Sequence, residues 1–145
     1  MAIVLAGCGG GGGLSKDEYT ERFRAAIARV DSATSVTTNP SGPDRELAAR
    51  EIEKVGAAYA ELRDDLSELG PPAEVEGAHG DYVSAAGELS GSFKRYGEKV
   101  REGDREAIAR GIAGVFEPPT IGKLERATKS FQEKGYRLGL ERPGP

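Results

Sequence analysis

Residues 75–100 read VEGAHGDYVSAAGELSGSFKRYGEKV, and this stretch decides the fold class. Its apolar and aromatic positions alternate spacings of four and three residues without a break, which places them on one face of an α-helix. These positions are Val75, His79, Tyr82, Ala86, Leu89, Phe93, Tyr96 and Val100. Five glycines in the stretch each weaken a helix by up to about 1 kcal/mol relative to Ala. The sequence nevertheless predicts a long helix over about 73–102 with one continuous seam.

Two further helices are predicted before this one. Ser15-Lys16-Asp17-Glu18 matches the S-x-x-E capping box and predicts a helix from residue 15 to about 31. A loop rich in Ser, Thr, Asn and Pro follows over 32–43, and a second helix is expected over about 44–69, where Gly70-Pro71-Pro72 stops it. The expected seam positions are Tyr19, Phe23, Ile27 and Val30 in the first helix and Ile52, Val55, Tyr59, Leu62, Leu66 and Leu69 in the second.

The C-terminal third predicts one interrupted helical arm. Asp104 is expected to cap a short helix through Ile108, Ile112 and Val115, which Pro118-Pro119 then breaks. A final helix carries Ile121, Leu124, Thr128, Phe131, Gly135 and Leu138. Residues 15–139 are therefore predicted to form an all-α, antiparallel four-helix bundle whose last arm is broken at Pro118-Pro119, with 140–145 as a frayed tail. A coiled-coil dimer is the lesser alternative, because short connections favour packing within one chain, so we expect a monomer.

Composition excludes several classes of function. The chain has 145 residues and a net charge of −4, with basic and acidic residues interspersed, so nucleic-acid binding is not expected. It contains one Cys and one His, too few of these residue types for the usual zinc sites. No C-x-x-C motif is present, so iron–sulfur, cytochrome and thioredoxin chemistry are not expected either.

The N-terminal run MAIVLAGCGGGGG, residues 1–13, allows two interpretations. Gly7, Gly9 and Gly12 match the G-x-G-x-x-G pattern of dinucleotide-binding folds, and Asp31 follows at a suitable distance. A run of five glycines satisfies any glycine pattern, however, and residues 15–31 form a helical pattern where that fold needs a strand. Dinucleotide binding is therefore disfavoured.

The second interpretation rests on Leu5-Ala6-Gly7-Cys8, which resembles the lipobox of bacterial lipoproteins. The resemblance implies that residues 1–7 end a signal peptide, that cleavage falls before Cys8, and that Cys8 carries the lipid. Residues 8–14 would then form a lipidated, glycine-rich tether. The residues before the box include no Lys or Arg, which a full export signal has. A cytoplasmic adaptor with a disordered N-terminus therefore stays open as an alternative.

A second resemblance covers most of the folded part by scattered short motifs. The sequence Leu69-Gly-Pro-Pro-Ala73, the His79-x-x-Tyr82 pair, Gly103-Asp104 and the run from Gly135 to Leu140 are similar to a group of small uncharacterised helical lipoproteins of bacteria. The resemblance implies one Cys in the first helix and another near the C-terminus. This chain has neither, and the resemblance implies no settled activity.

The remaining candidate for chemistry is His79, which Glu76 precedes by three residues. Glu-x-x-His is half of a di-iron carboxylate pattern, but a chain with one His cannot supply the second half. A structural histidine is the favoured interpretation, with a metal-binding or enzymatic bundle the least favoured alternative. No catalytic residue and no cofactor are therefore predicted. The leading hypothesis is a non-catalytic module, lipid-anchored through Cys8 on the extracytoplasmic face of the cell membrane, with an unidentified protein or small-molecule partner.

Overall fold

The computed structural model describes residues 13–34 and 42–140. In these ranges the chain forms five α-helices and two short 3₁₀ helices, and no strand. The helices are α1 (Lys16–Thr34), α2 (Arg45–Ser67), η1 (Ala73–Val75), α3 (Glu76–Glu102), α4 (Arg105–Arg110), η2 (Ile112–Val115) and α5 (Pro118–Glu133). The predicted all-α class is confirmed.

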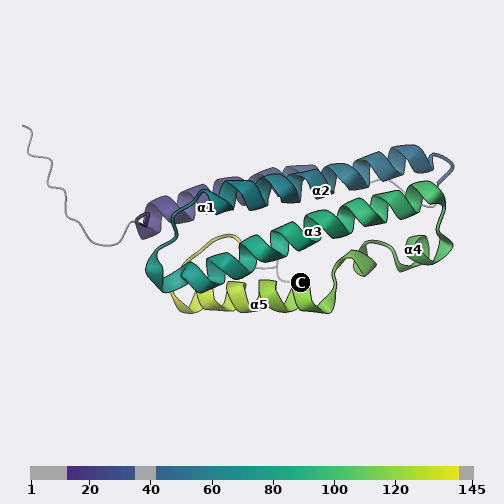
Figure 1. Cartoon of the computed structure of the whole chain (residues 1–145). Coiled ribbons are helices and arrows are strands. Elements are labelled where there is room, and N and C mark those ends of the chain that lie inside the picture. The colour runs from purple at the N-terminus through teal and green to yellow at the C-terminus, as the bar shows by residue number, and fades with distance from the viewer. Residues whose placement is uncertain (1–12, 35–41, 141–145) are drawn as a thin grey trace, which may run out of the picture.

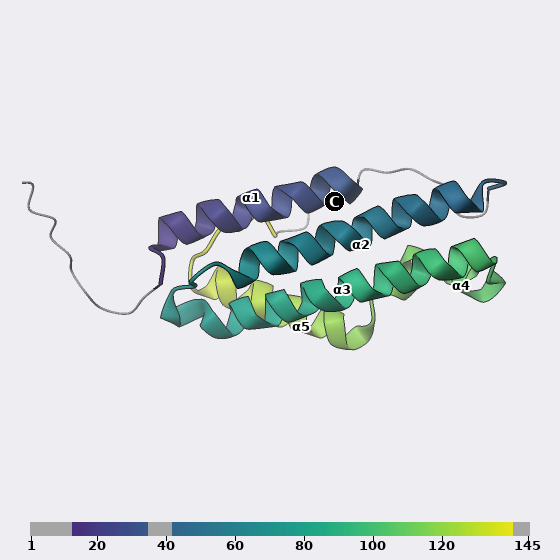
Figure 2. The ribbon, with the colours of Figure 1, turned by 45° about the horizontal axis from the view of Figure 1, so that its top comes forward.

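The helices form an elongated antiparallel bundle around the α2–α3 pair, the most extensive packing in the molecule (Figure 1). Helix α1 lies against the C-terminal part of α2, and α5 runs back along the first half of α3. Figure 2 shows that α2 and α3 extend well beyond α1, where the short helix α4 covers the end of α3. The bundle therefore has a proximal half enclosed by four helices and a distal half built mainly from two.

The seam that predicted α3 is confirmed in full, since all eight of its positions are buried. The helix starts are confirmed as well. The Ser15 hydroxyl donates to the Glu18 carboxylate at 2.7 Å and accepts from the Glu18 backbone N–H at 3.3 Å. Asp104 caps α4 by accepting from two backbone N–H groups. Local sequence therefore sets where these helices begin.

Two buried clusters divide the core. We call the first the proximal cluster; its members are Tyr19, Phe23, Ala26, Val30, Leu62, Leu66, Val75, Ala78, Tyr82, Ala86, Ala127, Phe131, Tyr136 and Leu138. The second is the distal cluster; its members are Ala48, Ala49, Ile52, Val55, Leu89, Phe93, Tyr96, Val100 and Val115. Tyr59 and Leu124 pack against both clusters, so they join the two halves.

Helices α2 and α3 approach each other closely at Gly56 and Gly97. A Cβ atom at Gly97 would lie 2.8 Å from Glu53 Cγ and 3.1 Å from the Ala49 carbonyl oxygen. A Cβ atom at Gly56 would lie 3.1 Å from the Ser90 carbonyl oxygen. All three distances are shorter than ordinary van der Waals contact, so glycine at these two positions permits the close spacing of α2 and α3.

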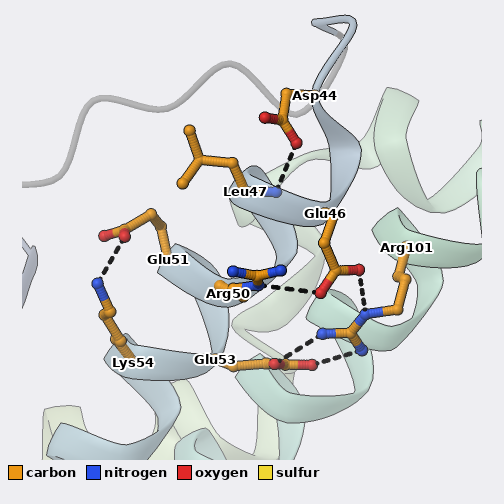
Figure 3. A network of polar contacts seen from close by, with 8 residues as sticks. All are labelled: Asp44, Glu46, Leu47, Arg50, Glu51, Glu53, Lys54 and Arg101. Atoms are coloured by element: carbon orange, nitrogen blue, oxygen red, sulfur yellow. Dashed lines mark hydrogen bonds and ion pairs between the residues drawn. The ribbon is translucent and has the colours of Figure 1, made fainter.

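An ion-pair network bridges the same two helices near the distal end (Figure 3). Arg101 of α3 donates to both carboxylate oxygens of Glu53, with N–O distances of 2.8 and 2.9 Å. Its Nε atom donates to Glu46 at 2.9 Å, and Glu46 also accepts from Arg50. Bidentate pairing of this kind fixes geometry better than a single exposed ion pair does.

The last arm differs from the prediction in three places. The expected single helix through Ile108 and Val115 ends at Arg110, because Gly111 adopts φ +61°, and Ile112 is 56% exposed. Pro118 and Pro119 begin α5 instead of breaking a helix, since proline fits the first helical turn. Helix α5 ends at Glu133, so Gly135 and Leu138 are not helical, although Leu138 is buried.

Both ends of the predicted domain also need correction. Leu14, assigned to the tether, packs against the proximal cluster and donates its backbone N–H to the Gly70 carbonyl at 2.8 Å. Leu140, assigned to the frayed tail, packs against the same cluster. Apolar side chains beyond the periodic segments explain both differences, because burial does not require helix.

The first helix and the C-terminal segment are joined without a disulfide. Lys16 Nζ donates to the Lys134 carbonyl oxygen at 2.8 Å and lies 4.6 Å from the centre of the Tyr136 ring. The Tyr19 and Tyr136 rings meet edge to face, with centroids 5.8 Å apart. A polar bond, a cation–π contact and aromatic packing thus connect regions that are distant in sequence.

Candidate functional site

Cys8, the predicted lipidation site, lies outside the described residues, as do residues 1–7. The structure does describe where the chain enters the bundle. Leu14 is bonded to Gly70, and a Cβ atom at Gly13 would lie 2.7 Å from the Pro71 carbonyl oxygen. The N-terminal segment therefore joins the bundle at the corner between α2 and α3. None of the described helices has the length and apolarity needed to cross a membrane.

His79, the residue singled out for chemistry, is buried in the proximal half with 7% of its surface exposed. The Tyr19 hydroxyl lies 2.9 Å from His79 Nδ1. Burial lowers the pKa of His79 below its usual 6.5, and a hydrogen bond to the Leu66 carbonyl opposes that shift. The lowered pKa favours the neutral imidazole, and in the tautomer with the proton on Nε2, Nδ1 accepts a hydrogen bond from the Tyr19 hydroxyl.

Glu76 and His79 do not share a site. Glu76 is exposed at the start of α3, whereas the partners of the His79 ring are a hydroxyl and a carbonyl group. Within residues 13–34 and 42–140, no group of three or more Cys, His, Asp or Glu side chains is placed to hold a metal ion. The geometry around His79 matches a hydrogen-bonded core histidine.

Tyr19, the hydrogen-bond partner of His79, and Tyr136, which packs against Tyr19, both have raised pKa values. Burial raises the pKa of Tyr19 well above 10, and the nearby Tyr136 raises it further. Burial, together with a 2.7 Å hydrogen bond to the Glu74 carboxylate, raises the pKa of Tyr136 to about 12. These hydroxyls stay protonated at neutral pH and act as hydrogen-bond donors.

A polar contact that the sequence did not predict joins α3 to α5. The buried Thr120 hydroxyl donates to Glu88 at 2.7 Å, and Lys123 pairs with the same carboxylate and donates to Ser84 at 3.0 Å. The Lys123 hydrogen bond is the main reason that the pKa of Glu88 is lowered. The Glu88 carboxylate and the Ser84 hydroxyl therefore each accept from a donor on α5, and the contact positions α5 against α3.

A groove with a volume of about 790 Å³ lies beside α5. Its apolar lining comes from Tyr82, Phe116, Ile121, Leu124 and Leu140. The periodic pattern had placed Ile121 and Leu124 on the core seam, but the structure leaves both half-buried at the edge of the groove. A groove of this size and lining can accept a small apolar ligand. The sequence did not predict this groove, because residues that line it and residues that face the core recur with the same 3–4 spacing.

Comparison with protein-family models, with curated proteins and with solved structures finds no match to this chain.

Proposed function

We propose that this protein is a lipid-anchored, non-catalytic binding module on the extracytoplasmic face of a bacterial cell membrane. The observation that carries the proposal is Leu5-Ala6-Gly7-Cys8, which contains the sole cysteine of the chain. Its resemblance to a lipobox is joined to a glycine run that leads directly to the capped start of α1. A lipidation signal, then a flexible tether, then a folded domain is the order expected of a lipid-anchored module.

The tether would hold the bundle close to the membrane. Five residues beyond Cys8 reach Gly13, which lies against Pro71, and an extended chain spans about 3.6 Å per residue. The α2–α3 corner would therefore stay within roughly 18 Å of the lipid-bearing sulfur. Two or three acyl chains on Cys8 would give firm anchoring, since each buried methylene contributes about 0.8 kcal/mol.

The non-catalytic part of the proposal is supported by how the polar groups are used. The single imidazole is hydrogen-bonded in the core, and the Glu88 carboxylate is occupied by Thr120 and Lys123. The groove beside α5 offers a surface for binding, with apolar side chains on its wall and Glu125, Lys129 and Gln132 among its polar lining residues. Ligand capture is therefore the role that this arrangement suits best.

Anchoring is tested by expressing the protein from its own gene, with the upstream DNA included, in a bacterial host. The membrane fraction is then treated with maleimide–polyethylene glycol under denaturing conditions. Because Cys8 is the sole cysteine, one mass shift reports one free thiol. We expect membrane-bound protein that resists labelling and an acylated N-terminal peptide by mass spectrometry, with Cys8→Ala released to the soluble fraction. Soluble wild-type protein with a reactive Cys8 thiol would overturn the proposal and favour a cytoplasmic adaptor.

Binding at the groove is tested separately with Nile red, a neutral dye that fluoresces in apolar surroundings. Ile121→Lys places a charge in the groove and should abolish most of the dye fluorescence. Ile112→Lys is the matched control, because Ile112 is exposed and lies outside the groove lining. Equal dye binding by both variants would contradict a ligand role for the groove.

A further inference from the structure

A second depression lies at the distal tip, where α2 begins, α3 ends and α4 begins. We call it the tip pocket; it has a volume of about 560 Å³. Its lining includes Pro43, Arg45, Gly103, Arg105, Ile108 and Ala109. Two arginines and three apolar side chains thus face one space, and no acidic residue contributes to the lining.

The position of Arg45 depends on Gly103. This glycine ends α3 with φ +76°, a conformation that L side chains rarely adopt. A Cβ atom at Gly103 would overlap the Arg45 guanidinium, so the guanidinium rests directly on the glycine backbone. This contact places the Arg45 guanidinium at the wall of the tip pocket.

Neither Arg45 nor Arg105 forms an ion pair or a side-chain hydrogen bond within the described part of the chain. The acids beside them are already engaged. Asp44 accepts from the Leu47 backbone N–H at 2.9 Å, and Asp104 accepts from the Glu106 and Ala107 N–H groups at 3.1 and 3.0 Å. The two guanidinium groups therefore retain their donors for a ligand.

We propose that the tip pocket binds the phosphate group of a small soluble molecule. A guanidinium presents a planar fork of N–H donors that matches phosphate oxygens, and two such forks suit a doubly charged group. Pro43, Ile108 and Ala109 provide an apolar wall for the organic part of the ligand. The pocket volume falls within the range of small-molecule sites.

The place of the pocket in the fold favours a soluble phosphate over a lipid headgroup. Helix α3 has 27 residues and separates the tip from the corner where residues 13 and 14 are held. At 1.5 Å per residue, this separation is roughly 40 Å. The preference for a soluble ligand rests on the proposed anchoring through Cys8, whereas the tip pocket itself is formed by the folded bundle alone.

The test is a titration of the full chain with phenyl phosphate at constant ionic strength, followed by amide NMR shifts. We expect saturable shifts centred on Gly103, Arg105 and Ala109, with inorganic phosphate binding more weakly because it lacks an apolar part. Arg45→Gln and Arg105→Gln should each weaken binding by about tenfold or more, as expected for a lost hydrogen bond to a charged group. Arg126→Gln is the matched control, since Arg126 is an exposed arginine on α5 outside this pocket.

Two results would overturn the proposal. The first is an equal effect of Arg45→Gln and Arg126→Gln, which would show that phosphate associates with surface cations in general. The second is binding to vesicles containing phosphatidylglycerol, lost in Arg45→Gln, without any binding of phenyl phosphate. That outcome would assign the pocket to a lipid headgroup. Thermal unfolding of every variant checks that a lost signal reflects binding and not unfolding.

Discussion

The proximal and distal halves of the bundle share helix α3 but are packed in different ways. In the proximal half, four helices and the C-terminal segment enclose large rings, with Phe23 lying 5.1 Å from Tyr82 and 5.5 Å from Phe131 between ring centroids. In the distal half, two helices meet through glycine and alanine, and Arg101 ties them together at the surface. Both halves contain aromatic rings, but a single 3–4 repeat supports a wide interior enclosed by four helices in one half and a narrow interior between two helices in the other. Gly56 and Gly97 permit the closer approach in the distal half.

The largest effect should come from emptying the wide interior. Phe23→Ala removes a fully buried ring that contacts residues from α3 and α5. We expect a loss of about 4 kcal/mol in the free energy of unfolding, measured by urea denaturation. Amide exchange should rise first in α1 and at residues 136–140. A uniform rise over both halves would show that the bundle has one cooperative core and not two.

An added methyl group between α2 and α3 in the distal half should destabilise the protein. Gly97→Ala places a methyl group against Glu53 and the Ala49 carbonyl, so α2 and α3 must separate. The expected cost is about 2 kcal/mol, typical of overpacking in a tight core. Unfolding in urea measures it, and loss of protection at Arg101 would localise the change. An unchanged urea midpoint would mean that the α2–α3 contact can accommodate the added methyl group.

Acid should weaken the proximal half selectively. The pKa of His79 is lowered in the folded protein, whereas the unfolded chain takes up a proton near pH 6.5. The contribution of neutral His79 to stability is therefore complete above pH 6.5 and is lost as the pH falls below it. Urea midpoints between pH 8 and pH 5.5 should fall in the wild type, and the fall should be smaller in His79→Gln. Parallel profiles would assign the pH dependence to other groups.

The smallest expected effect is an increase in the stability of the protein. Gly80 lies on the exposed face of α3, with open space where a Cβ atom would be. Gly80→Ala should stabilise the protein by up to about 1 kcal/mol, because alanine restricts the unfolded chain and favours helix. Thermal unfolding of the Gly80→Ala and Gly97→Ala variants compares the same substitution on the exposed face of α3 and on the face that packs against α2. A loss of stability in Gly80→Ala would indicate that this face is covered in solution.

The sequence predicted the features that depend on neighbouring residues. The α3 seam and the Ser15 cap follow from helix geometry, so spacing alone revealed them. The break at Gly111 was missed because Ile112 continues the apolar period although its side chain is exposed. Pro118 was assigned to the wrong end of a helix, since proline fits a first turn as well as a break.

The candidate sites depend on contacts between distant residues, which periodicity does not encode. The sequence placed His79 on the seam, but its partner Tyr19 comes from another helix and is 60 residues away. The seat of Arg45 on Gly103 likewise requires the turn that brings α3 back to the start of α2. Local patterns predict which side chains face inward, and the rotation and stagger of the helices decide which of them meet.

The bond between Lys16 and the Lys134 carbonyl spans 118 residues, and it has a consequence for the order of events during synthesis. The distal half comes from one continuous stretch of chain and can assemble while translation continues. The proximal half must wait, because Tyr19 and Phe23 emerge early whereas Phe131 and Tyr136 emerge last. A newly made chain can therefore complete the proximal cluster only when synthesis is almost finished, although α1 can dock on α2 and α3 earlier.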